Sequence, residues 1–355
     1  MDRSITLDWV QVPLKEPFRI SNGSVDVKDA IVVSYRQDGV TGYGEASPMS
    51  GAFYSAETPE STWNALEKLA PAVLRDRRVD LDTVVAGEAF AKAGLVGALL
   101  DRDLRASGTP LWKWLGSCDR PVPSGVAIGL FDTIEELLDR VGLYVSQGYR
   151  RVKIKIMPGW DVEPVSRVRE RFPHTPLMVD ANAAYTLAHL PVFRELDRFG
   201  LMMYEQPLGR HALEDQAELA RAVRTPLCAD ESADSLEMLE RLIQLGAAGI
   251  INIKIQRVGG IHNARRMHDR AQQAGLPCWM GTMPELGIAS AEAVHLATLP
   301  NFLYPTDVEA SSRWYTDDLI DPPITVTSDG FLEPAIVNVS VEKLDRYSRK
   351  RATLK

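Results

Sequence analysis

Cysteine is scarce in this chain, and the few cysteines are poorly placed for cross-links. Only three occur among 355 residues, at Cys118, Cys228 and Cys278. An odd number at wide spacing argues against a disulfide framework and against a Cys-rich metal site. A chain of this length can bury a sizeable core without such cross-links. We therefore expect a protein of a reducing, cytoplasmic compartment.

Long apolar runs and an excess of basic residues are also missing. No stretch reaches the ~18 apolar residues of a membrane-spanning helix, and the start, MDRSITLDWVQVPLKEPF, does not read as a signal peptide. The formal net charge is −8, so the sequence has no electrostatic signature of nucleic-acid binding. The expected partner is a small molecule, with no role for nucleic acid or membrane.

The first third of the chain reads as a mixed α and β domain. Apolar alternation predicts two strands that pair antiparallel, and helical spacing of Trp63, Leu66 and Leu69 then introduces helices. The predicted elements are strands over 4–12 and 30–35 and helices over 57–74 and 92–106. We expect an α+β domain over residues 1–118.

From about residue 121, short apolar runs alternate with amphipathic helices. This uninterrupted series calls for parallel strands joined by right-handed crossovers. The predicted strands are 150–157, 176–182, 201–207, 226–232, 249–255 and 277–283, and the helices between them are 165–172, 190–199, 213–223, 235–246 and 262–275.

Charged residues stand at or near the ends of five of these strands: Lys155, Asp180, Glu205, Asp230 and Lys254. The successive spacings are 25, 25, 25 and 24 residues, which is one strand, loop and helix each time. In a (β/α) barrel the carboxyl ends of the strands converge on one mouth, where catalytic groups gather. In an open sheet the five charges would lie along a line without a common centre. The spacing therefore favours the barrel.

The three acids suggest a metal site. Asp180, Glu205 and Asp230 follow apolar residues on successive strands, so facing carboxylates would repel one another unless a cation lay between them. Carboxylate oxygens with water and substrate oxygens suit octahedral Mg²⁺, with Mn²⁺ as a second possibility. Any single acid could instead be an ordinary loop residue or helix N-cap, but three in register argue against that alternative.

The lysines suggest a general base. Lys153 and Lys155 lie two apart on one strand and so share a face, and Lys254 closes another strand after the apolar run GIINI. A buried lysine beside other cations has a lowered pKa and can accept a proton at neutral pH. With a metal to stabilise an enediolate, two lysines on opposite sides of the barrel can act on the carbon next to a carboxylate. A solvated K-x-K edge is the alternative for the first pair.

The motifs K-x-K, DAN, EQP, ADES and INIK follow one another in this order. They resemble the enolase superfamily, in its muconate-lactonizing-enzyme branch. The resemblance covers most of the chain and implies a TIM-type barrel of seven to eight βα units over 119–321, a capping domain over 1–118, and a C-terminal tail, 322–355, that returns to the cap. Barrels of this kind often form homo-oligomers.

The resemblance also implies roles for individual residues. Asp180, Glu205 and Asp230 are the expected metal ligands, and Lys155 and Lys254 the acid/base pair. Lys153 is expected to tune Lys155, and Asn182 to lie beside the metal.

Further motifs, KIMPGWDVEPV, FYSAETPEST, RVGGIHNARRMHD and DVEASSRWYTDDLI, resemble the o-succinylbenzoate synthase and N-succinylamino acid racemase group. Arg257 matches an arginine of racemase-capable members, and Glu285 matches a motif glutamate at the end of the last clear strand. The strand there reads GTMPELG, whereas the group usually has a sequence like GGMLETG. This departure concerns the substrate and leaves the proton chemistry unaffected.

Other residues have weaker signals. The segment 16–23, with Phe18, Ser21 and Gly23, is expected either to close over the substrate or to form a simple turn. Ser311 belongs to a Ser-rich loop that could face the mouth. Glu231 follows Asp230 and should point to the other side of the strand, behind the metal ligands.

Three alternatives remain at this stage. Muconate cycloisomerisation and dipeptide epimerisation use the same chemistry, although PTDVEAS lacks the D-x-D typical of the epimerases. A binding protein on a retained barrel is a non-enzymatic alternative, but no acid or lysine of the motif set is lost. The favoured activity is lyase or isomerase chemistry: synthesis of o-succinylbenzoate in menaquinone biosynthesis, racemisation of N-succinylamino acids, or both.

Overall fold

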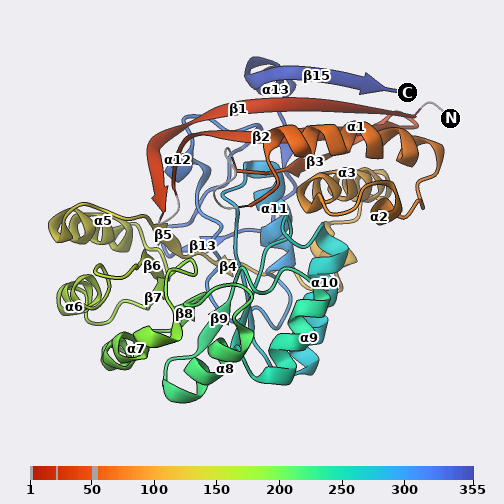
Figure 1. Cartoon of the computed structure of the whole chain (residues 1–355). Helices are drawn as coiled ribbons and strands as arrows, with labels where there is room; N and C mark the ends of the chain where they lie inside the picture. The colour runs from red at the N-terminus through yellow and green to blue at the C-terminus, as the bar shows by residue number, and fades with distance from the viewer. Residues whose placement is uncertain (1–2, 21–22, 50–54) are drawn as a thin grey trace.

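The computed structural model describes residues 3–20, 23–49 and 55–355. It places an antiparallel sheet above a parallel barrel (Figure 1). The upper sheet has the order β15-β1-β2-β3, and it is accompanied by helices on the right of the view. These elements are β1 (Arg3–Ile20), β2 (Gly23–Gln37), β3 (Val40–Ala46), β15 (Ser348–Leu354), α1 (Pro59–Arg75), α2 (Leu81–Val84), α3 (Ala89–Ser107), α4 (Leu111–Trp114) and α13 (Val341–Tyr347).

The middle of β2, Ala30–Val33, is buried on both faces of the upper sheet, which explains why four apolar residues follow one another there. Ile31 and Val33 pack into a cluster with α1 and α3. Ala30 and Val32 point the other way and pack with Leu286 and other residues near the barrel mouth. The period of two along a strand therefore sends alternate residues to the helices of the cap and to the barrel.

The barrel strands form one parallel sheet in the order β11-β10-β9-β8-β7-β6-β5. They are β5 (Val126–Ile128), β6 (Val152–Lys155), β7 (Leu177–Asp180), β8 (Tyr204–Glu205), β9 (Leu227–Ala229), β10 (Ile250–Ile253) and β11 (Cys278–Met280). The helices around them are α5 (Ile134–Ser146), α6 (Val162–Arg171), α7 (Leu190–Leu196), α8 (Leu213–Ala222), α9 (Leu236–Leu245), α10 (Ile261–Gln273) and α11 (Gly287–Leu296). The expected TIM-type barrel with an α+β cap is confirmed.

An extended segment, 301–307, joins the two edges of this sheet. On one side, the Leu303 amide donates to the Cys278 carbonyl of β11 at 3.0 Å. On the other, the Gly125 amide next to β5 donates to the Thr306 carbonyl at 2.8 Å. The segment therefore takes the place of an eighth strand and closes the ring, so that β5 and β11 are not left as open edges of the barrel sheet.

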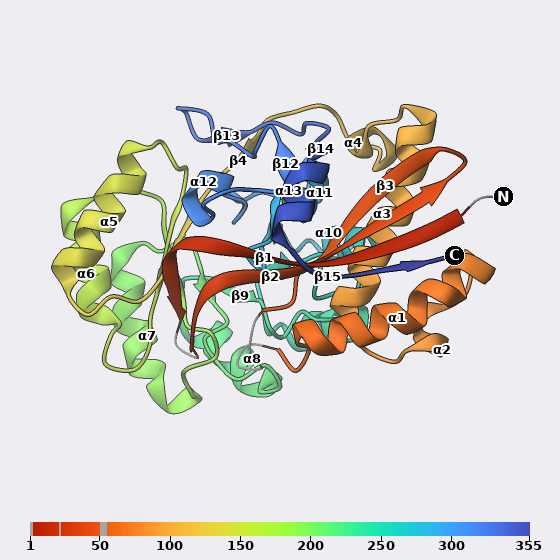
Figure 2. The same cartoon turned by 90° about the horizontal axis from the view of Figure 1, so that it is seen from above.

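The tail runs back over the molecule from the barrel to the cap (Figure 2). Short pieces pair on the way: β13 (Phe331–Leu332) with β4 (Val122–Pro123), and β14 (Asn338–Val339) with β12 (Ile320–Asp321). The final strand, β15, then pairs antiparallel with β1. The remaining short helices are α12 (Ser311–Trp314), η1 (Leu187–His189) and η2 (Asp197–Phe199).

The far end of the β1–β2 hairpin bends toward the barrel on the side of α5 (Figure 1). Arg140 of α5 forms an ion pair with Glu16 of β1 at 2.9 Å, and Leu14 bridges to Tyr315. The predicted loop over 16–23 is therefore largely a strand pair, with Phe18 opposite Val25.

Among the helices that the structure describes, none is both long and apolar enough to cross a bilayer.

Candidate active site

Alternation along the strands turns one set of residues into the barrel and stacks it in two layers. The lower layer is apolar on β7, β8, β9 and β11, with Met178, Met203, Cys228 and Trp279 in one buried cluster, whereas β6 and β10 contribute Lys153 and Asn252. The upper layer, two residues further along each strand, is charged. Lys155, Asp180 and Glu205 end β6, β7 and β8, and Asp230 and Lys254 directly follow β9 and β10. All five side chains are buried, so the structure brings the five predicted residues together.

On the β6 side, Lys155 is held by two acceptors. Its ammonium donates to Asp180 Oδ2 at 2.5 Å and to Asn182 Oδ1 at 2.8 Å. The backbone N–H of Asn182 donates in turn to Asp180 Oδ1 at 2.9 Å. Burial opposes ionisation of Asp180, but Lys155 and Lys153 outweigh it and hold the pKa of this carboxyl below its usual value. Asn182 thus fixes the direction of the lysine that we expect to act as base.

On the β10 side, Asp230 accepts from two cations. Lys254 lies 2.9 Å from Asp230 Oδ2, and Arg257 pairs with Asp230 Oδ1. Burial again opposes ionisation, but Arg257 and Lys254 hold the pKa of Asp230 well below its usual range. The Asp230 amide N–H donates to Gln206 Oε1 at 3.0 Å, which fixes the chain at this strand end.

Glu205 ends β8, which lies between the lysine-bearing strands β6 and β10 in the sheet, and its side chain is fully buried. Its Oε1 accepts from Asn252 Nδ2 at 2.9 Å, and the same amide also reaches Asp230 Oδ1 at 2.8 Å. Its Oε2 is buried without a hydrogen-bond partner in the described structure, although the Lys153 ammonium stands 3.2 Å away. Burial and the Asp180 carboxylate raise the pKa of Glu205 well above its usual range.

Lys153 differs from a general base in its surroundings. Burial lowers its pKa, but Asp307, Glu205 and Asp180 more than offset that and raise the pKa well above the usual value. Its ammonium also lies 4.9 Å from the centre of the Trp279 ring. Lys153 is therefore held in its charged form beside Asp307, Glu205 and Asp180, and its tuning of Lys155 stays a prediction.

Asp307, Arg151 and Asn252 are site residues that the sequence reasoning missed. Asp307 pairs with Lys153 and, at 2.6 Å, with Arg151. Despite burial, Lys153 and Arg151 hold the pKa of Asp307 at about 2. The available signal was Asn252 and Arg151 at inward positions of their strands, two residues before Lys254 and Lys153.

Replacing Asp307 with asparagine should destabilise the fold, because it leaves two buried cations short of a countercharge. Removing one partner of a buried ion pair costs about 3–5 kcal/mol. Urea unfolding of Asp307→Asn and of the unchanged chain measures the difference. The matched control is Asp103→Asn, whose carboxylate pairs with Arg77 at an exposed position and should change stability by less than about 1 kcal/mol. Equal effects of the two changes would contradict the prediction.

The cavity at these residues is small, about 50 Å³, and both lysines line it. A larger cavity of about 390 Å³ lies elsewhere, between α3 and α11. The predicted lysines and the strand ends make the smaller one the candidate active site. It continues along Met49, Thr282, Met283, Pro284 and Trp314, which come from the cap, the β11–α11 loop and α12.

The acids fit a divalent cation by their chemistry. Within the described part of the chain, no three acidic, His or Cys side chains converge as a ready-made metal site, because the lysines, Arg257 and Asn252 occupy the carboxylate oxygens. Three buried carboxylates on neighbouring strands are nevertheless the oxygen donors that Mg²⁺ prefers. The Glu205 Oε2 atom has no hydrogen-bond partner among the described residues, and it is therefore an oxygen that could coordinate a cation.

Strand alternation predicted that Glu231 would point away from the site, and this prediction is wrong. β9 ends at Ala229, so alternation no longer applies beyond it, and Glu231 Oε1 accepts from Asn182 Nδ2 at 3.1 Å. Burial and Asp230 raise the pKa of Glu231 to about 7.

The remaining predicted residues lie further out. Glu285 stands beyond the end of β11, beside Lys28 and Glu45 of the cap, and burial raises its pKa to about 7. The Ser311 hydroxyl is bonded to Asp318, and Ser311 is not among the described residues that line the catalytic cavity. Phe18 and Gly23 belong to the β1–β2 pair, and Ser21 falls outside the described residues.

Comparison with protein families matches the two parts of the chain separately. Residues 3–116 match the mandelate racemase / muconate lactonizing enzyme N-terminal domain, and residues 136–335 match the enolase C-terminal domain-like family. The chain belongs to the enolase superfamily. The fold and the family resemblance expected from the motifs are confirmed.

Within this superfamily, the chain is similar to enzymes with two names. It is 41% identical to an o-succinylbenzoate synthase of Geobacillus kaustophilus, over 98% of this chain and 95% of the relative. It is 44% identical to an N-succinylamino acid racemase of Amycolatopsis, over 90% of this chain and 89% of the relative. The first name describes a lyase and the second an isomerase. A solved structure of an enolase superfamily member from Listeria innocua superimposes with a TM-score of 0.94 at 30% identity, covering 99% of this chain and 98% of that one.

Proposed function

We propose that this protein removes the α-proton of a carboxylate substrate with Lys155 and Lys254, as an o-succinylbenzoate synthase, an N-succinylamino acid racemase, or both. One observation carries the proposal: the two lysines line the same cavity from β6 and from the end of β10, with β7, β8 and β9 between them in the sheet. They therefore approach a bound substrate from opposite sides. The acids at the ends of those intervening strands lie between the two amines.

A divalent cation, Mg²⁺ or Mn²⁺, is part of the proposal, held by Asp180, Glu205 and Asp230. When bound, it would supply positive charge that stabilises the negatively charged oxygens of an enediolate. The chain's own residues prepare that role. Asn182 and Asn252 orient the carboxylates through hydrogen bonds, and burial excludes the water that would weaken their field.

In the synthase reaction, Lys155 as a free amine takes the α-proton of a cyclohexadiene carboxylate. The same lysine then gives that proton to the departing hydroxide, so that water leaves and the ring becomes aromatic. Lys254 stays a cation beside the enediolate, at the position that Asp230 fixes. In racemisation, one lysine removes the α-proton from one face and the other lysine delivers a proton to the opposite face.

Lys153, Asn182 and Arg257 take supporting roles in this proposal. Lys153 is held by Asp307 and lends positive charge beside Glu205 and Asp180. Asn182 fixes the ammonium of Lys155. Arg257 shares Asp230 with Lys254, so it sets how strongly that carboxylate holds the second lysine. Each of these residues acts through a neighbour and leaves the proton transfer to Lys155 and Lys254.

The substrate is tested by a parallel turnover assay. The purified protein is given the synthase precursor and a panel of N-succinylamino acids, with a dipeptide and a muconate as competing substrates of the same chemistry. We expect turnover of the precursor, of the succinylated amino acids, or of both, and its loss with excess EDTA. Turnover of only the dipeptide or the muconate would overturn the assignment, and turnover that is unchanged by EDTA would overturn the role of the metal.

A further inference from the structure

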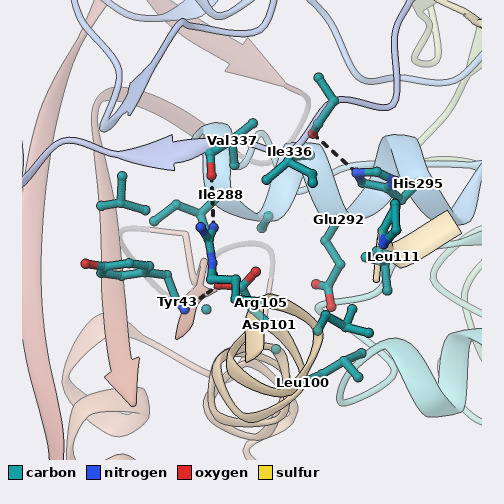
Figure 3. A pocket seen from close by; sticks show the side chains of 18 of the residues that line it. Tyr43, Leu100, Asp101, Arg105, Leu111, Ile288, Glu292, His295, Ile336 and Val337 are labelled. Atoms are coloured by element: carbon teal, nitrogen blue, oxygen red, sulfur yellow. Dashed lines mark hydrogen bonds and ion pairs between the residues drawn. The ribbon is translucent and has the colours of Figure 1, made fainter. Parts of the chain in front are cut away.

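The larger of the two cavities described above lies on the seam between the cap and the barrel (Figure 3), and neither Lys155 nor Lys254 lines it. Its volume is about 390 Å³, within the range of pockets that hold small organic ligands. Helix α3 of the cap forms one wall, helix α11 of the barrel another, and the tail at 335–339 the third. Most of the lining is apolar: Leu100, Leu104, Leu111, Ile288, Ala291, Ile336, Val337 and Val339.

One carboxylate reaches into this apolar space. Glu292 extends from α11 toward α3 (Figure 3), and its oxygens lie near the backbone of Gly97, where an added Cβ would stand 3.6 Å from Oε1. Among the described residues, no hydrogen bond or ion pair reaches Glu292. Burial raises its pKa to about 8, and the carboxylates of Asp101, Glu45 and Glu285 push it in the same direction. A carboxyl in such a place has no countercharge from its own chain.

The other charged groups of the cavity are already matched. Asp101 accepts from the Tyr43 amide at 2.8 Å and from Arg105 Nε at 2.6 Å. Arg105 also donates to the Val337 carbonyl at 2.9 Å. This network explains why Arg105 does not turn to Glu292.

A second polar group in the lining is incomplete. His295, one turn after Glu292 on α11, is 4% exposed. Its Nε2 lies 3.2 Å from the Ala335 carbonyl, while its Nδ1 is buried with no partner among the described residues. Burial lowers the pKa of His295, so the ring is neutral at pH 7. A ligand therefore meets one acid without a countercharge and one neutral imidazole within an apolar chamber.

We propose that this cavity is a second binding site, for a small organic cation that carries an ammonium group on an apolar body. The ammonium pairs with Glu292, and the apolar body covers the Leu and Ile side chains of the walls. An anion would face the ionised form of Glu292, which has no countercharge, and a neutral alcohol would supply no charge to pair with it. The site does not depend on the catalytic proposal, because it shares no residue with the lysine cavity.

Titration calorimetry with three probes of equal length tests the inference: hexylamine, 1-hexanol and hexanoate. At about pH 8.5 an alkylammonium is still charged, and we expect hexylamine to bind most tightly. Glu292→Gln should weaken hexylamine at least about 10-fold and leave 1-hexanol nearly unchanged. Glu67→Gln, an exposed glutamate of α1, is the matched control and should change neither. Glu292→Asp keeps the charge and should retain part of the preference for the amine.

Proton release gives an independent readout. At about pH 7 the Glu292 carboxyl is mostly protonated, because its pKa is about 8, and a bound ammonium favours the ionised form. Binding should therefore release close to one proton, measured from the heats in two buffers of different ionisation enthalpy, and Glu292→Gln should release none. The charged and titratable groups that share the cavity lining with Glu292 are Tyr43, Glu45, Asp101, Arg105 and His295, and Glu285 also acts on it electrostatically.

Three results would overturn the site. One is that 1-hexanol binds as tightly as hexylamine. Another is that Glu292→Gln and the unchanged chain bind the amine equally. The last is that none of the probes binds. This result counts against the site whether ultracentrifugation shows a single chain or an assembly of several copies. Circular dichroism of each variant separates a loss of binding from a loss of fold.

Discussion

Replacing Lys155 with alanine should lower turnover by about 10²–10⁴-fold, the contribution of a positioned general base. The variant should also stop exchange of the α-hydrogen with solvent on the face that Lys155 serves. Proton NMR in D₂O follows that exchange directly, and it reports on proton removal even where the later steps are slow. The physical reason is the position of the amine. Asp180 and Asn182 direct Lys155 into the cavity, and a base in bulk solvent does not reach a buried α-carbon in the same way.

The Lys254→Ala variant separates the two activities. In racemisation, each lysine serves one face, so each single variant should exchange only one enantiomer and interconvert neither. In the synthase reaction, Lys254 acts by charge, so its loss should slow turnover while Lys155 still exchanges the proton. The control is Lys68→Ala, at an exposed position of α1. Substantial exchange by Lys155→Ala with both enantiomers would defeat the assignment of the base.

The five charged strand ends were predictable because two periodicities agree. The spacing of about one βα unit put Lys155, Asp180, Glu205, Asp230 and Lys254 at equivalent places, and strand alternation turned them to the same side. In the structure they form the charged layer above Met178, Met203 and Cys228. Shifting any strand by one residue would have turned its inward side chains outward. The apolar residues before each charged residue therefore helped to fix the register of the strand.

The closing segment was not predictable in the same way. Residues 301–307 have no apolar alternation, and they pair with β11 and with the chain before β5 through only a few hydrogen bonds. Asp307 therefore looked like part of an ordinary loop. Its function depends on Arg151, 156 positions away in sequence, and a contact between such distant residues leaves no local pattern. Asn252 was missed for a different reason, since an amide carries no charge to attract notice.

Strand length limited two other predictions. Strand β8 covers only Tyr204–Glu205 and β9 only Leu227–Ala229, so alternation could not place Glu231, one residue after Asp230. Glu285 was expected at a strand end, but β11 stops at Met280 and a loop carries Glu285 to the cap. Short strands followed by loops are where backbone direction departs from a period of two.

Adding Mg²⁺ should stabilise the folded protein, and replacing Glu205 with glutamine should remove that effect. A ligand that binds only the folded chain at about 100 times its Kd contributes about 2.7 kcal/mol, and a thermal melt with and without MgCl₂ shows it as a rise in Tm. Without added metal, Glu205→Gln should melt no lower than the unchanged chain. Burial and the Asp180 carboxylate disfavour the charge on Glu205, which offsets the loss of its ion pair with Lys153 at 3.2 Å, and a glutamine oxygen can still accept from Asn252 Nδ2.

The Glu205→Gln variant is informative because its Tm should differ from that of the unchanged chain only when Mg²⁺ is present. A substitution that merely damages the fold lowers Tm in both conditions, whereas loss of a ligand lowers it only with Mg²⁺ present. Lys153 keeps Asp307 and Asp180 as partners when Glu205 becomes neutral, so the change leaves no cation without a countercharge. Glu218→Gln, an exposed glutamate of α8, should keep the full shift with Mg²⁺. If Glu205→Gln keeps the full rise in Tm with Mg²⁺, this carboxylate does not hold the metal. The proposed catalytic role of Glu205 would then be wrong.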